Sequence, residues 1–181
     1  MIDARVARRY ARALIDVASQ DGRHEKIGAE LEAISMAMAA PEVRDVLTNP
    51  AYAGPQRRSV VMALGKRLNL SPLTTNFLSL LVDRQRIEEI EAVARVYRDL
   101  LDEKVGRVRA VVTSALPLNP DDLARVRDTL AAATRKSVVL ESKTDPAIVG
   151  GLVTKVGTFV WDGSLRTQLE RLREELKQGP A

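Results

Sequence analysis

The stretch that most limits the possible fold is residues 144–172, TDPAIVGGLVTKVGTFVWDGSLRTQLERL. The glycine pair at 150–151 suits a bulge or a close approach of two backbone segments. Two short runs rich in β-branched and aromatic residues follow, at 152–156 and 158–161, and they predict two strands. The Asp-Gly-Ser sequence at 162–164 predicts a turn into a helix, because a serine hydroxyl can accept from a free amide of the first turn. A strand, strand, helix unit is therefore expected.

The helix behind this turn has one apolar face. Its leucines recur at spacings of four, three and four, which place them along a single helical stripe: Leu165, Leu169, Leu172 and Leu176. The stripe needs a partner, either within the unit or in another polypeptide.

The first part of the chain has the period of amphipathic helices. Apolar residues recur three and four positions apart, and Gly or Pro separates the segments. Ser71 and Pro72 together are typical of a helix start, with a capping hydroxyl followed by a proline at the first helical position. Six helices are predicted, over about 3–20, 27–38, 41–47, 54–68, 72–82 and 87–105. Their short connections favour a bundle.

The period changes after Gly106. Residues 107–116 and 137–142 are rich in valine and predict strands, while Asn119-Pro120 between them predicts a capped helix that ends by Thr134. We therefore predict an α+β fold class, with an N-terminal six-helix bundle over 1–105 followed by a small C-terminal α/β domain over 106–181.

The charge of the chain suggests one alternative function. The formal net charge is +4, and the first predicted helix carries Arg5, Arg8, Arg9 and Arg12, so a basic helical protein that binds nucleic acid or another anionic surface is a second hypothesis. Residues 1–105 hold 16 basic and 15 acidic side chains, and 106–181 hold 12 and 9. Neither part is a basic domain, and a bundle helix with solvated arginines is the simpler interpretation.

The residues needed for common catalytic and metal sites are scarce. His24 is the one histidine and there is no cysteine, which excludes a histidine-based triad or metal cluster, or a cysteine nucleophile, within one chain. Gly65-Lys66 is followed by Arg67, so the phosphate-loop pattern fails. We expect no enzyme activity, no cofactor, no metal site and no catalytic residue. The sole tryptophan, Trp161, either covers the C-terminal core or contacts a partner.

Three segments resemble one family. The C-terminal stretch matches in its acidic residue, its glycine pair, its basic residue with a following glycine, and its Asp-Gly-Ser before an Arg- and Leu-rich helix. The segments ARRYARALIDVA at 7–18 and NFLSLLVDRQRI at 76–87 are also similar. On these residues the chain resembles the delta subunit of bacterial F-type ATP synthases, a relative of the mitochondrial oligomycin-sensitivity-conferring protein.

The resemblance implies a non-catalytic stator subunit of the peripheral stalk, which links the catalytic head to the membrane sector and resists rotor torque. It implies that a groove between the first and fifth helices receives the N-terminal helix of an alpha subunit. By position, the candidate residues are Tyr10, Ala13, Leu14, Phe77, Leu78 and Leu81. These six residues either form that groove or build the bundle core.

The resemblance also implies that the C-terminal domain meets the C-terminal ends of the b subunits. The candidates, which either contact b or form the domain core, are Leu152, Val153, Val156, Leu165, Leu169 and Leu172. The implied location is the cytoplasmic face of the bacterial inner membrane, with peripheral attachment through the complex and no nucleic-acid partner.

Overall fold

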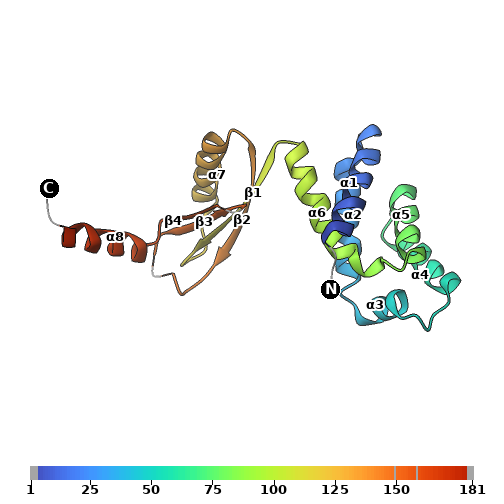
Figure 1. The fold of residues 1–181 in the computed structure, drawn as a ribbon. Helices are drawn as coiled ribbons and strands as arrows, with labels where there is room; N and C mark the ends of the chain where they lie inside the picture. The colour runs from blue at the N-terminus through green and yellow to red at the C-terminus, as the bar shows by residue number, and fades with distance from the viewer. Residues whose placement is uncertain (1–3, 149, 158, 179–181) are drawn as a thin grey trace. The chain divides into compact units, whose positions relative to one another are not determined.

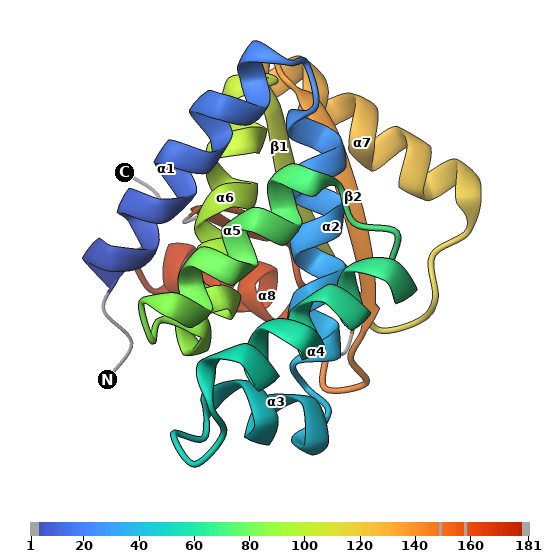
Figure 2. The same cartoon turned by 90° about the vertical axis from the view of Figure 1, so that its right-hand side faces the viewer.

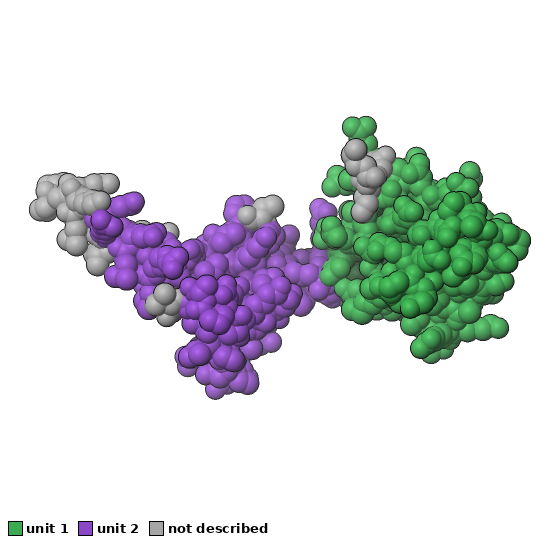
Figure 3. All heavy atoms as spheres, turned by 90° about the horizontal axis from the view of Figure 1, so that it is seen from below, with its two compact units in different colours: residues 1–101 green, residues 102–181 purple. Residues whose placement is uncertain are grey.

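The structure, a computed structural model, describes residues 4–148, 150–157 and 159–178, without the side chains of 171, 172 and 175–178. Its chain divides into two compact units, Met1–Leu101 and Asp102–Ala181 (Figure 3). The sequence places the boundary after residue 105, and the structure divides within the last helix of the first unit. Helices and a small mixed sheet occur together, so the predicted mixed α+β class is confirmed.

Unit 1 is helical throughout its regular structure (Figure 1). In the described residues its elements are α1 (Ala4–Gln20), α2 (His24–Ala37), α3 (Pro41–Thr48), α4 (Gly54–Arg67), α5 (Pro72–Asp83), a 3₁₀ turn (Ile87–Glu89) and α6 (Ile90–Lys104), which runs on past Leu101. The sequence predicts one helix from residue 87. The structure separates that span into the 3₁₀ turn and α6.

Helix α1 packs inward through small residues. Its buried positions are Ala7, Ala11, Leu14, Ile15 and Ala18. Alanines allow neighbouring helices to approach closely, and α2 contributes Ile27, Leu31 and Ile34 to the same core. The larger apolar stripe of α1, which includes Tyr10 and Val17, is therefore not the face buried deepest.

A buried carboxylate links α2 to the start of α5. Glu30 accepts hydrogen bonds from the backbone N–H of Ser71 at 3.0 Å, from the Ser71 hydroxyl at 2.7 Å and from the Thr74 hydroxyl. The Ser71 hydroxyl in turn accepts from the Thr74 amide at 3.4 Å. The predicted serine cap is present, and Glu30 adds a negative charge at the positive end of α5. This contact holds α5 against α2.

Unit 2 contains a four-stranded sheet in the order β2-β1-β3-β4. The elements are β1 (Arg107–Ser114), α7 (Pro120–Thr134), β2 (Ser137–Thr144), β3 (Leu152–Val156), β4 (Phe159–Asp162) and α8 (Leu165–Gln178). β1 pairs in parallel with β2, in the register Arg107 to Ser137, and α7 is the crossover that a parallel pair requires. β1 and β3, and β3 and β4, pair antiparallel. Thr158, in the predicted fourth strand, lies outside the described residues.

The glycine pair closes onto the turn before α8. The Gly163 amide donates to the Leu152 carbonyl and the Leu165 amide donates to the Gly150 carbonyl, each at 2.9 Å. Asp162 accepts from the Ser164 amide at 2.9 Å, and the Ser164 hydroxyl accepts from the Thr167 amide at 3.3 Å as the helix cap. These hydrogen bonds, all within residues 144–172, fix the start of α8.

Candidate functional site

An apolar groove lies between α1 and α5, which run side by side in unit 1 (Figure 2). It has a volume of about 390 Å³. From α1 it is lined by Arg9, Tyr10, Ala13, Leu14 and Val17, and from α5 by Leu73, Asn76, Phe77 and Leu80. Such a surface can bind another apolar element but provides no set of reactive groups.

Two aromatic side chains line the groove. The rings of Tyr10 and Phe77 meet edge to face, with centroids 6.2 Å apart and an interplanar angle of 68°. This is a favourable arrangement for two aromatic side chains, and it ties α1 to α5 at this point. Val17 and Leu80 at the sides are 45% and 43% exposed. Large apolar side chains therefore remain accessible along both walls.

The structure brings four of the six residues predicted for this site into the groove, namely Tyr10, Ala13, Leu14 and Phe77. Leu78 and Leu81 lie elsewhere, in the core, with 1% and 0% exposure. The helical period explains the division, because at about 100° per residue positions 78 and 81 point roughly 165° and 105° away from the direction shared by 73, 76 and 80.

Sequence reasoning missed five residues of the lining: Arg9, Val17, Leu73, Asn76 and Leu80. Spacing could have found three of them. Val17 continues the stripe of Tyr10 and Ala13, while Leu73 and Leu80 lie four before and three after Phe77. Arg9 and Asn76 carry no such signal, since a polar residue beside an apolar stripe usually faces only solvent.

The residues predicted to meet the b subunits are spread over β3 and α8. Val156 is buried, while Leu152 and Val153 are half-buried. Leu165 and Leu169 are exposed, Leu169 by 65%. The side chain of Leu172 lies outside the described residues. Exposed leucines at 165 and 169 leave one face of α8 available to a partner.

A second apolar groove, of about 440 Å³, lies between α7 and the sheet of unit 2. Trp161 lines it together with Val126, Leu130 and Thr154. Trp161 is 48% exposed and stacks on Phe159, with ring centroids 6.2 Å apart and an interplanar angle of 23°. The two rings form an apolar strip on β4, so Trp161 covers the sheet only in part.

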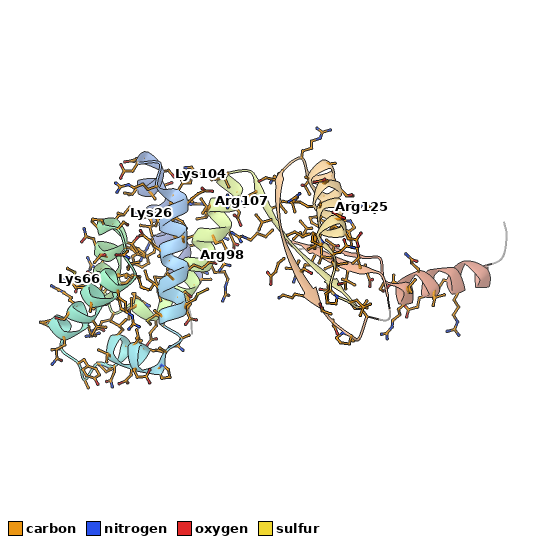
Figure 4. All side chains as sticks on the ribbon, turned by 180° about the vertical axis from the view of Figure 1, so that it is seen from behind. Lys26, Lys66, Arg98, Lys104, Arg107 and Arg125 are labelled. Atoms are coloured by element: carbon orange, nitrogen blue, oxygen red, sulfur yellow. The ribbon has the colours of Figure 1, made fainter. Side chains whose placement is uncertain are left out.

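Basic side chains come from several elements, and those labelled in Figure 4 belong to α2, α4, α6, β1 and α7. Ion pairs between different helices of unit 1 join Arg44 to Glu91 at 3.2 Å, Arg58 to Asp83 at 2.8 Å and Arg98 to Glu32 at 3.0 Å. Local pairing of this kind differs from the cationic track with interleaved aromatics that single-stranded nucleic acid requires.

Tyr97, in α6, has a shifted pKa. Burial, reinforced by the nearby Glu30 carboxylate, raises the pKa of Tyr97 to about 12. The phenol donates to the His24 carbonyl at 2.9 Å, so its role is to join α6 to the start of α2. No group of three or more potential metal-ligating side chains occurs among the described residues. In the same part of the chain, no helix combines the length and hydropathy needed to cross a bilayer.

Known proteins match this chain over nearly its whole length. The family model of the ATP synthase delta (OSCP) subunit matches residues 6–176. ATP synthase subunit delta of Myxococcus xanthus (strain DK1622) is 45% identical, covering 98% of this chain and 100% of that protein. The subunit delta of Anaeromyxobacter sp. (strain K) has the same identity and coverage.

A solved structure is similar as well. It is a chain of the cryo-EM structure of the Toxoplasma gondii mitochondrial ATP synthase hexamer, with a TM-score of 0.69 and 25% sequence identity, covering 97% of this chain and 98% of that chain. Family model, sequence relatives and solved structure agree: the chain belongs to the ATP synthase delta (OSCP) subunit family.

Proposed function

We propose that this chain, a non-catalytic peripheral-stalk subunit of F-type ATP synthase, joins the catalytic head to the membrane sector through two separate surfaces. The groove between α1 and α5 receives the N-terminal helix of an alpha subunit. Unit 2 receives the C-terminal ends of the b subunits. The link holds the head against the torque of the rotor.

The observation that carries the proposal is the apolar groove between two helices. The lining of α1 extends from Arg9 to Val17 and that of α5 from Leu73 to Leu80. At a rise of 1.5 Å per residue the α1 wall is about 12 Å long and the α5 wall about 10.5 Å, which is room for about two turns of an added helix. Ala13, small and exposed, permits the close approach that helix-in-groove recognition needs, and Phe77 supplies an anchor.

In unit 2 the support comes from α8. Leu165 and Leu169 share one face, and both are exposed. An amphipathic helix of this kind can add to a helical partner such as the end of a stalk subunit. Leu152, Val153, Leu172 and the buried Val156 complete the proposed set, with Val156 supporting the surface from beneath.

Residues 1–105 act as one six-helix bundle that binds alpha, and residues 106–181 bind b. The subunit lies on the cytoplasmic face of the bacterial inner membrane, attached peripherally through the complex. Nucleic acid is not among its partners. Local pairing of arginines with acids supports this choice over an anionic-surface binder.

A single substitution tests the groove. Ala13→Asp places a carboxylate inside the apolar lining, where a docked helix would bury it without a partner. We expect binding of an alpha-subunit N-terminal peptide to weaken at least tenfold, the equivalent of about 1.4 kcal/mol. The matched control is Ala4→Asp, the same change at an exposed position of α1 outside the groove. Equal affinity of the two variants would count against the groove as the alpha site.

A further inference from the structure

The two walls of the α1 and α5 groove differ in charge. Arg9 is the one residue of the lining that carries a charge at neutral pH. The α5 wall consists of Leu73, Asn76, Phe77 and Leu80, and is neutral. The groove is therefore apolar at its base, basic along the α1 edge and uncharged along the α5 edge.

The arginine is held at this edge by an aromatic ring. Its guanidinium carbon lies 5.4 Å from the centroid of the Tyr10 ring, within the range of a cation–π contact. Tyr10 also lines the groove and meets Phe77 edge to face. A guanidinium positioned in this way loses less conformational freedom on meeting a partner than a fully solvated one.

The charge continues along the same side of α1. Positions 5, 9 and 12 follow one another at spacings of four and three, which place their side chains in one row on a helix. Arg12 is exposed. Asp16 comes four residues after Arg12 and reverses the sign at the C-terminal end of the row. Positive charge is thus concentrated beside the N-terminal half of the groove.

We propose that Arg9 selects the occupant of the groove: an amphipathic helix with acidic side chains along the flank that faces α1 and none required along the flank that faces α5. This inference rests on the proposed function, because it assumes that the groove binds a helix of the alpha subunit. It adds the chemistry of that helix and the direction in which its charged flank points. Charge complementarity of this kind contributes mainly to specificity and orientation.

The test uses the full chain and two designed helical peptides. Both share one leucine and alanine face, and they differ only along one flank, which carries glutamates in one peptide and lysines in the other. We expect the glutamate peptide to bind about threefold to tenfold more tightly at low salt, the range of a few exposed ion pairs. The preference should fall below about twofold in roughly 0.5 M salt, where screening shortens the reach of surface charges.

The variant Arg9→Glu should reverse the preference in favour of the lysine peptide. Its matched control is Arg8→Glu, the same change at an exposed neighbour that does not line the groove. That variant should keep the preference of the unmodified chain. Circular dichroism and thermal unfolding verify that both variants remain folded.

The outcomes separate the inference from the proposed function. If both peptides bind the unmodified chain equally, the preference for an acidic flank is overturned, while the groove remains a site that binds a helix. If Arg8→Glu and Arg9→Glu change the preference equally, overall charge rather than Arg9 is responsible, and the inference fails. If neither peptide binds, the groove itself is overturned, and the inference with it.

Discussion

The α-carbon of Gly151 faces the backbone carbonyl of Gly163, so closely that a side chain at 151 would overlap that oxygen and lie 2.9 Å from the α-carbon of Ser164. Gly151 also has a φ of 86°, which side-chain-bearing residues rarely adopt. Two backbone segments thus touch where the loop after β2 meets the turn before α8. This contact explains why position 151 requires a glycine, and at position 163 a Cβ would lie 3.2 Å from the Leu152 carbonyl oxygen.

Gly151→Ala should therefore destabilise unit 2 by about 2–4 kcal/mol, because backbone strain and steric overlap add. Gly157→Ala is the matched control. Gly157 also has a positive φ, of 58°, but nothing lies within 4 Å of the position that its Cβ would occupy, so strain alone should cost about 1 kcal/mol. Urea unfolding followed by fluorescence of Trp161, the sole tryptophan, measures unit 2 directly. Equal losses in the two variants would contradict the contact.

Substitutions at Leu80 and Leu78 distinguish a groove residue from a core residue on the same helix. Leu80→Ala should weaken binding of the alpha peptide while changing the free energy of unfolding by less than about 0.5 kcal/mol, because this side chain is exposed. Leu78→Ala should cost about 3 kcal/mol of stability, because it leaves a cavity in the core. Chemical denaturation and peptide titration of both variants check the pair. A large loss of stability in Leu80→Ala would mean that the Leu80 side chain belongs to the core and not to the groove.

The stability of unit 1 should depend on pH in the alkaline range through Tyr97. Its pKa is about 12 when folded, against an ordinary value of 10.0. Below pH 10 the phenol is protonated in both states, and its contribution is constant. Between pH 10 and 12 only the unfolded chain loses the proton, so stability falls with rising pH, by at most about 1.4 kcal/mol per pH unit.

The variant Tyr97→Phe should show a shallower decline over the same range. Below pH 10 it should be less stable by about 1 kcal/mol, because the hydrogen bond to the His24 carbonyl is lost. Urea unfolding at a series of pH values measures both effects. Parallel curves for the two proteins would mean that other groups cause the alkaline loss.

The exposed face of α8 gives a test in unit 2. Leu169→Asp should weaken binding to the b subunits about tenfold or more, because it places a charge in an apolar contact. Gln168→Asp makes a charge change on the adjacent exposed residue and should retain nearly full affinity. Co-purification of each variant with the other synthase subunits compares them. If both associate normally, the b contact lies elsewhere in unit 2.

The spacing of apolar residues and the residues typical of turns and helix caps predict most of the helices and strands. Ser71 with Pro72, and Asn119 with Pro120, start α5 and α7 as expected, since each cap needs only residues close in sequence. The turn at 162–164 was recognised for the same reason. Local signals of this kind do not depend on the rest of the fold.

Contacts between distant residues were not predictable in this way. Glu30 is 41 residues from Ser71, and nothing near it in the sequence indicates that its carboxylate will be buried at the start of another helix. The resemblance names Leu78 and Leu81 by position as groove residues, with the bundle core as the alternative, and the apolar run of α5 covers more than one face. Only the packing of α5 decides which of its faces meets the core.

Strand order has a mechanical consequence. After two residues that follow the end of α6, the chain enters β1, an inner strand paired over eight positions with β2 and over five with β3. Tension that reaches unit 2 along the backbone at Arg107 first meets the ladder to β2, and from Ala110 onward it meets the ladder to β3 as well. Because β1 is an inner strand, no edge strand has to be peeled away first.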